Sequence, residues 1–210
     1  PPRPPPALFF FHPQDSNRDA QESRWLGDVY KRQTQDDMFI RFSNQEQINE
    51  YAPSADNSAG TYRLQDRSKI KGAIVAKENI LVWTDNALYS MKFVGAPFTF
   101  SFEQAGTNCG LLGKNACVEV DGTALWMSEN GFFQYAGQLQ SMPCLVEDYV
   151  YDDLNTTARN LVCCGLNNLF TEISWYYCTN GSDVIDRVVT YNYQETVSYT
   201  HLTLPTILLV

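Results

Sequence analysis

The sequence predicts an all-β fold, a partial β-propeller of about three to four blades of antiparallel strands, with one short helix near residues 145–154. An apolar strand ending near a Trp, a polar turn and a second aromatic strand occur over Ile80–Tyr89 and again over Ala124–Phe133. A looser copy runs over 172–191. The Trp residues of the three copies are 43 and 49 residues apart, at 83, 126 and 175. Such periods are typical of propellers built from four-stranded sheets.

The first elements are short strands separated by polar loops. Met38–Ser43 alternates in hydropathy and predicts a strand, which a polar segment beginning at Asn44 and a loop over Ser54–Gly60 follow. Arg63–Gln65 and Ile70–Ala76 predict two further strands around a charged turn.

The clearest hairpin pairs Ile80–Trp83 with Leu88–Val94. Gly95–Pro97 then interrupts the pattern, and Phe98–Phe102 alternates strictly, which predicts three phenylalanines on one strand face. We expect these rings to pack in the core or between blades; stacking on a sugar or a base is the alternative.

Cys117–Tyr135 predicts a three-stranded meander, because Asp121–Gly122 and Asn130–Gly131 are strong hairpin-turn signals. Leu145–Leu154, between Pro143 and Asn155, is the one stretch with helical character. Three more strands are expected near the end, at Val162–Gly165, Phe170–Tyr177 and Arg187–Tyr193.

Both ends of the chain resemble translated sequencing adapter, over residues 23–33 and 197–206, in opposite orientations. Scars of this kind are excluded from fold reasoning. We therefore expect a non-native leader over 1–33, the propeller fragment over 34–196 and an adapter-like tail over 197–210.

Histidine and charge narrow the classes of function. The only histidines, His12 and His201, lie outside 34–196, so catalysis or metal binding through His is not expected there. The net charge is −9, which disfavours binding to polyanions. The densest basic group is interpreted as solvated surface rather than a phosphate site; it comprises Arg63, Arg67, Lys69 and Lys71.

The six cysteines show no Cys-x-x-Cys spacing, so the strong zinc and redox patterns are missing. We expect buried free thiols, with disulfides or a metal site as the alternatives. The residues are Cys109, Cys117, Cys144, Cys163, Cys164 and Cys178.

Two segments carry weak chemical signals. Asn108–Asn115 contains Gly113–Lys114 but lacks the first Gly and the final Ser/Thr of a phosphate-binding loop, so we expect an interstrand loop rather than a nucleotide site. An acidic group on the predicted helix could supply a carboxylate pair, bind calcium or magnesium, or form solvated or subunit-facing surface; it comprises Glu147, Asp148, Asp152 and Asp153. The surface interpretation is preferred, and the sequence predicts no enzyme, cofactor or metal site.

Several blocks, in order, resemble the packaged-DNA stabilisation proteins of short-tailed bacteriophages. The blocks are 40–46, 51–53, 57–60, 80–89, 125–127, 132–133, 143–144, 150–155, 175–177, 185–187 and 191–193. The resemblance spans nearly all of 34–196, although members of that family are much longer.

The resemblance implies a tail hub or nozzle protein in the virion tail, assembled in the host cytoplasm as a homo-oligomeric ring. Its implied neighbours are portal or adaptor proteins and tail needle or fibre proteins, and DNA would pass through the lumen without sequence-specific binding. We expect acidic residues such as Asp121 and Glu129 to keep passing DNA from sticking. The alternatives are a propeller glycoside hydrolase or lyase and a sugar-binding attachment module.

Overall fold

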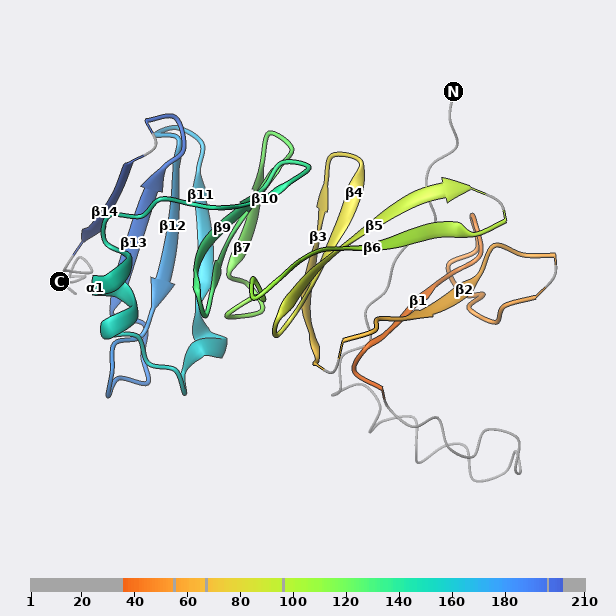
Figure 1. Cartoon of the computed structure of the whole chain (residues 1–210), viewed down its shortest axis with the longest axis horizontal. Coiled ribbons are helices and arrows are strands. Elements are labelled where there is room, and N and C mark those ends of the chain that lie inside the picture. Colours follow the sequence, from red (N-terminus) through yellow and green to blue (C-terminus); the bar gives the residue numbers. More distant parts are fainter. Residues whose placement is uncertain (1–35, 55, 67, 96, 196, 202–210) are drawn as a thin grey trace, which may run out of the picture. The chain divides into compact units, whose positions relative to one another are not determined.

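The computed structural model describes residues 36–54, 56–66, 68–95, 97–195 and 197–201, in which strands predominate (Figure 1). The described chain divides into two compact units. The first contains the described residues up to Asp66 together with Phe93–Thr99, and the second contains 68–92 and the described residues from Phe100 onward.

The first unit contains a two-stranded antiparallel sheet of β1 (Phe39–Phe42) and β2 (Gly60–Arg63). Ile40 and Phe42 alternate with exposed or half-exposed neighbours and are buried, as the hydropathy pattern of this strand predicts. Gly60 lies against the Phe42 ring, so a side chain at residue 60 would clash with it.

The loop between β1 and β2 is held by side-chain amides. The Asn44 amide nitrogen donates to the Glu50 carboxylate at 2.8 Å, and its carbonyl oxygen accepts from the Ser58 amide at 3.1 Å and hydroxyl at 3.0 Å. The Asn57 amide nitrogen donates to the other Glu50 oxygen at 3.2 Å. These bonds give a polar segment a defined conformation without an apolar core of its own.

The second unit begins with a sheet in the order β3-β4-β5-β6. Its strands are β3 (Ile70–Ala76), β4 (Asn79–Thr84), β5 (Ala87–Gly95) and β6 (Thr99–Thr107). The predicted hairpin is confirmed, because β4 and β5 pair antiparallel and leave a two-residue turn at Asp85 and Asn86. The ends of β5 and β6 that lie within Phe93–Thr99 belong to the first unit.

A second sheet has the order β10-β9-β8-β7. Its strands are β7 (Cys117–Val120), β8 (Thr123–Ser128), β9 (Gly131–Tyr135) and β10 (Leu139–Ser141). The predicted meander over β7, β8 and β9 is confirmed, and β10 adds a fourth strand that the sequence did not indicate. Gly131 is the first residue of β9, so the turn consists of Glu129 and Asn130, one residue earlier than predicted.

The third sheet has the order β11-β12-β13-β14 and follows the short helix α1 (Glu147–Asp152) and a 3-10 turn at Arg159–Leu161. Its strands are β11 (Cys163–Asn167), β12 (Glu172–Tyr177), β13 (Arg187–Asn192) and β14 (Val197–His201). The helix and the first three strands lie where the sequence predicts them. β14 falls in the segment interpreted as adapter-like, and the predicted domain boundaries remain predictions.

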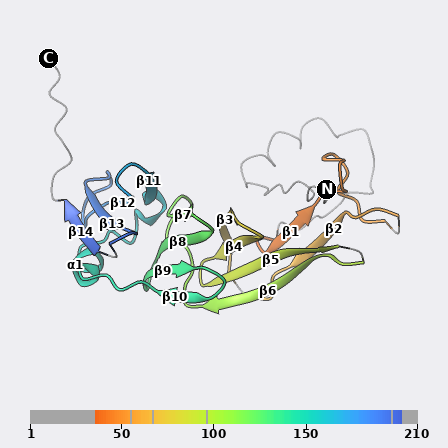
Figure 2. The same cartoon turned by 90° about the horizontal axis from the view of Figure 1, so that it is seen from above.

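The first strands of the three sheets are neighbours. β7 lies beside both β3 and β11, and Figure 2 shows these strands following one another. A parallel bridge joins Asn115 to Cys163, and the Cys164 amide donates to the Asn115 carbonyl at 2.8 Å. The second unit is therefore a succession of three four-stranded antiparallel meanders linked along their first strands.

One prediction about the aromatic residues is wrong. β6 begins at Thr99, so Phe98 lies in the preceding turn and is 76% exposed, whereas Phe100 is 5% exposed. Phe98 does not share a strand face with the other two phenylalanines. β5 ends at Gly95 and β6 begins only at Thr99, after Pro97, so Phe98 precedes the strand.

Candidate functional site

Equivalent turns relate the first two sheets. The Thr84 hydroxyl accepts from the Asn86 amide at 3.2 Å, and the Ser128 hydroxyl accepts from the Asn130 amide at 3.5 Å. Thr84 and Ser128 are therefore equivalent residues. Trp83 lies one residue before Thr84, whereas Trp126 lies two residues before Ser128. Because successive side chains of a strand point to opposite faces, the two Trp side chains occupy opposite faces of their own sheets.

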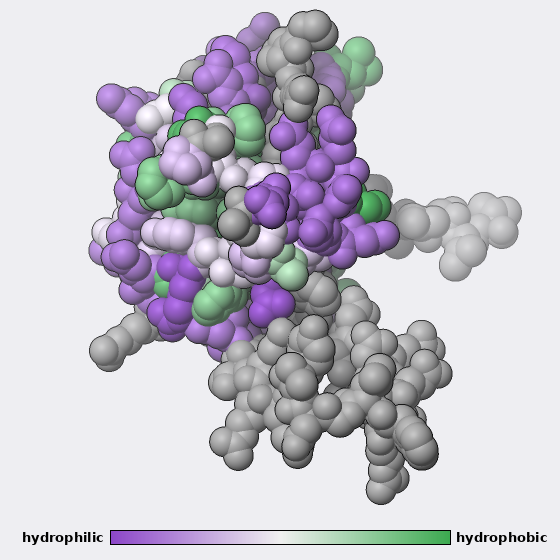
Figure 3. Space-filling view, turned by 90° about the vertical axis from the view of Figure 1, so that its right-hand side faces the viewer, coloured by the Kyte–Doolittle hydropathy of each residue, from purple (hydrophilic) through white to green (hydrophobic). Residues whose placement is uncertain are grey.

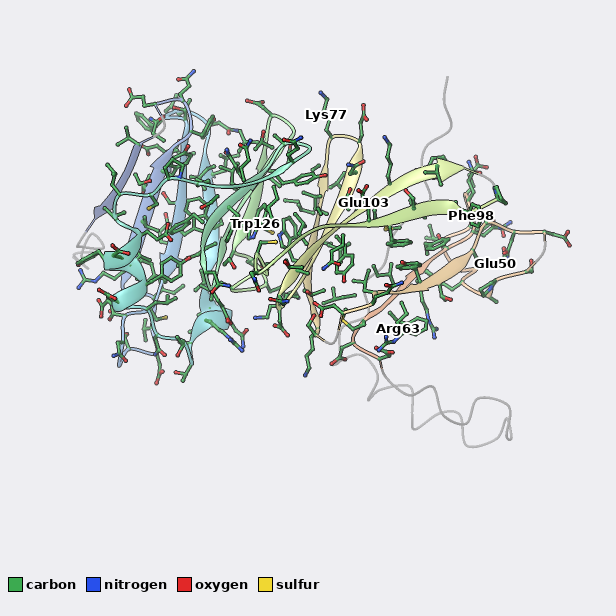
Figure 4. All side chains as sticks on the ribbon, viewed as in Figure 1. Glu50, Arg63, Lys77, Phe98, Glu103 and Trp126 are labelled. Atoms are coloured by element: carbon green, nitrogen blue, oxygen red, sulfur yellow. The ribbon has the colours of Figure 1, made fainter. Side chains whose placement is uncertain are left out.

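That shift brings the two indoles into one interface. We call the face of each sheet that turns toward the next sheet its leading face, and the opposite one its trailing face. Trp83 lies on the leading face of the first sheet and Trp126 on the trailing face of the second, with ring centroids 5.2 Å apart in an edge-to-face arrangement. Both are fully buried, and the Trp126 Nε1 donates to the Cys109 carbonyl at 2.8 Å. Figure 4 labels Trp126 within this packed interior.

The second and third sheets meet in a related way. Phe132, on the leading face of the second sheet, packs against Trp175 on the trailing face of the third, with ring centroids 5.1 Å apart. The Trp175 Nε1 donates to the Ala116 carbonyl at 3.0 Å. Buried aromatic pairs of this kind contribute both area and geometric specificity, so they fix the stacking of the three sheets.

Asn108–Asn115 connects the first sheet to the second, as the interstrand-loop prediction states. The Leu111 amide donates to the Thr84 carbonyl at 3.1 Å, and the Leu112 amide donates to the Met127 carbonyl at 3.0 Å. Gly113 packs against the carbonyls of the Arg159 turn. These loop amides are bonded to backbone carbonyls and do not converge on an anion site.

The acidic group lies on and just after α1. Asp148 and Asp152 are exposed, and Asp153 and Glu147 are half-buried. Burial, and secondarily the charge of Asp148, raises the pKa of the Glu147 carboxyl above its usual value. Over the part of the chain that the structure describes, no group of His, Cys, Asp or Glu side chains has the arrangement of a metal site.

The basic group is divided among separate interactions. Arg63, in the first unit, pairs with Asp36 at 2.6 Å, and this bond holds the pKa of the Asp36 carboxyl below its usual value. Lys71, in the second unit, pairs with Asp85 at 3.0 Å and donates to the Leu112 carbonyl at 3.2 Å. Arg67 lies outside the described residues.

The two acids predicted to face DNA occupy turns of the second sheet. Asp121 is exposed in the turn between β7 and β8, with a left-handed backbone (φ 51°) before Gly122. Glu129 is exposed in the turn between β8 and β9 and pairs with Arg159. Glu129 therefore has a neutralising partner.

All six cysteines are free thiols, as predicted, but the predicted burial holds only for Cys109 and Cys178. The other four are half-buried. Burial raises the pKa of Cys109 and that of Cys117 to about 11, and it also raises the pKa of Cys164. These thiols are protonated at neutral pH and are therefore weak nucleophiles.

The exposed apolar residues of the first unit include Phe98 and Ile48. On the face that Figure 3 shows, the hydrophobic residues, in green, form separate areas between hydrophilic residues, in purple, and residues of intermediate hydropathy, in pale colours.

In the described ranges, no helix has the length and apolar character needed to cross a bilayer.

The sequence did not reveal which strand faces stack or which carbonyls receive the indoles. The choice of stacking faces could have been predicted from one signal: the spacing of the two Trp residues, 83 and 126, is one residue shorter than the spacing of the equivalent turn residues, Thr84 and Ser128.

No protein-family model matches this sequence, and no curated protein matches it.

Proposed function

We propose that the second unit forms three successive blades of a β-propeller. The observation that carries this proposal is the position of β7 beside both β3 and β11, since the first strand of each blade lies nearest the axis of a propeller. The common meander order and the aromatic interfaces between consecutive sheets also support it.

The function that we propose is structural: a tail hub or nozzle component of a short-tailed bacteriophage. In this role copies form a ring below the portal, contact adaptor and needle or fibre proteins, and help to retain packaged DNA in the virion. The support is the sequence resemblance together with the placement of its blocks. Ile80–Tyr89, Leu125–Met127 and Trp175–Tyr177 all belong to the strands that build the stacked interfaces.

The two acids predicted to keep passing DNA from sticking differ in whether a cation neutralises them. Asp121 is exposed in the turn between β7 and β8, so it is the stronger candidate for repelling DNA. Glu129 is a weaker candidate because Arg159 neutralises it.

The test uses phage particles that carry charge changes in this protein. Asp121→Lys is expected to slow DNA ejection and Asp121→Asn to have a smaller effect, because added positive charge attracts phosphate. Asp183→Lys, at an exposed loop position, is the matched control. Unchanged retention and ejection in Asp121→Lys particles would contradict the charge part of the proposal, and particles that retain DNA without this protein would contradict the structural role.

The enzymatic and sugar-binding alternatives are tested with the purified chain. Turnover of a polysaccharide panel that disappears in Asp148→Asn or Asp152→Asn would replace the structural proposal with a hydrolase or lyase. Glycan-array binding without turnover would favour an attachment module.

A further inference from the structure

The leading face of the third sheet differs in burial from its counterparts. One cross-strand pair between the second and third strands occupies the same place on each leading face: Trp83 with Leu88, Met127 with Phe132, and Tyr176 with Val188. The first two pairs are at most 1% exposed, whereas the third is half-buried.

The second strands show the same contrast along their length. β8 is buried at every position after the first, and β4 over its last four residues, so both faces of these strands are covered. In β12 burial alternates strictly: Ile173, Trp175 and Tyr177 are buried, and the residues between them are half-buried. The trailing face of the third sheet is therefore covered, and its leading face is covered only in part.

The next sheet or the connector that leads to it approaches a small residue of the first strand on each of the first two leading faces. Gly72, opposite Trp83, leaves room for the Leu111 side chain and the Lys114 carbonyl, which lie 3.0 and 3.2 Å from where a Cβ would be. Ala116, which pairs with Met127, accepts the Trp175 indole hydrogen bond. Cys163, opposite Tyr176, is the equivalent small residue of the third sheet.

The polar pair in the middle of this face is bonded within the sheet. Ser174, half-buried, and Thr190, already only 4% exposed, face each other across β12 and β13, and their hydroxyl oxygens are 2.9 Å apart in a hydrogen bond. A polar pair that is already bonded loses less on desolvation than an unpaired group. The Tyr176 ring approaches Gly165, 3.5 Å from where a Cβ would be, so this glycine leaves room for the ring on the leading face.

We infer that this leading face is the docking face for a further four-stranded antiparallel sheet of the same repeat, carried on the same polypeptide, whose second strand presents a Trp toward Cys163 and Val188. The observation that carries the inference is continuity with the two interfaces already formed. It deepens the propeller part of the proposed function and rests on that part.

The experiment supplies such a sheet. The full chain is extended at its C-terminal end by a second copy of residues 142–201, which contain the connector, α1 and the third sheet. Val188→Glu in the first copy is expected to lower the Tm of the extended chain by about 4 °C more than it lowers that of the unextended chain. Val75→Glu, at an exposed position of β3, is the matched control and is expected to have the same small effect in both chains.

A double-mutant cycle then identifies the contact. With Trp175→Ala in the appended copy, the extra effect of Val188→Glu is expected to disappear, because the two residues share one interface. Equal effects of Val188→Glu in both chains, or additive effects in the cycle, would overturn the inference. A dimer of the unextended chain that Val188→Glu dissociates would assign the face to a second copy and would also overturn it. Either result leaves the DNA-ejection experiment as a separate test of the tail hub proposal.

Discussion

At the scale of single residues, burial controls the chemistry of this protein's thiols. Cys109 is fully buried and Cys117 half-buried, beside aromatic interfaces that exclude water. Desolvation disfavours the thiolate, which is the reactive form. The cysteines thus behave as small apolar side chains in the interfaces between sheets.

This burial predicts a loss of stability at high pH. The pKa of Cys109 is about 11 in the folded chain against 9.0 for an unperturbed thiol, so above pH 9 the unfolded chain loses a proton that the folded chain retains. The stabilising contribution is complete below pH 9 and is lost as the pH rises through 11, by up to about 3 kcal/mol. Urea unfolding between pH 8 and 11 measures it.

The control for this prediction is Cys109→Ala, which removes the titrating group. Its stability is expected to fall less steeply over the same pH range, although its stability at pH 8 is lower because of the cavity. Parallel curves for the two proteins would show that other groups cause the loss.

At the scale of elements, the three indoles have different hydrogen-bond states. The Nε1 groups of Trp126 and Trp175 donate to connector carbonyls, whereas the buried Trp83 Nε1 has no partner among the described residues. An unpaired buried donor costs free energy that a paired one does not. The connectors therefore do more than join sheets. Their carbonyls accept the hydrogen bonds of two of the three Trp Nε1 groups that the stacking buries.

This difference predicts unequal effects of the same substitution. Trp126→Phe leaves the Cys109 carbonyl without its indole donor, while Trp83→Phe removes a donor that has no acceptor. We expect Trp126→Phe to lower the free energy of unfolding by about 1–3 kcal/mol more than Trp83→Phe does. Urea denaturation of the two variants measures the difference, and equal losses would mean that the hydrogen bond contributes nothing beyond ring packing.

At the scale of the whole molecule, the net negative charge opposes binding to DNA. The chain carries 24 Asp and Glu against 15 Lys and Arg, and Lys71 and Arg63 are both engaged with carboxylates. Tight binding to duplex DNA requires several cations that replace condensed counterions. The proposed function therefore requires that the chain border DNA without binding its phosphates.

The corresponding prediction is a negative gel-shift result at low ionic strength. At about 50 mM salt, where nonspecific phosphate contacts are strongest, the purified chain is expected not to retard duplex DNA. A variant with Asp121, Asp183 and Glu195 changed to Lys is expected to bind weakly and to lose that binding as salt is raised. Retardation of DNA by the unmodified chain would contradict the proposed passive role.

The strands were largely predictable from sequence because their signals are local. Alternating hydropathy and Asp121–Gly122 located the meander, and the Thr84 turn located the first hairpin. β10 was missed because its three residues are too short for a period, and the position of Phe98 was wrong because the turn extends one residue further than Pro97 suggests. The candidate loop at Gly113 was interpreted correctly as a connector because it lacks the complete phosphate-binding pattern.

The sequence by itself determined the class of fold, the order of most strands and the repeat, since each depends on side-chain periodicity and turn chemistry within a few residues. Only the tertiary structure decided which faces meet, because a shift of one residue reverses the face of a strand side chain and places Trp83 against Trp126. It also decided which carbonyls accept the indoles and which sheet face stays partly uncovered. These properties depend on groups distant in the sequence that only folding brings together, such as Ala116 and Trp175, which are 59 positions apart.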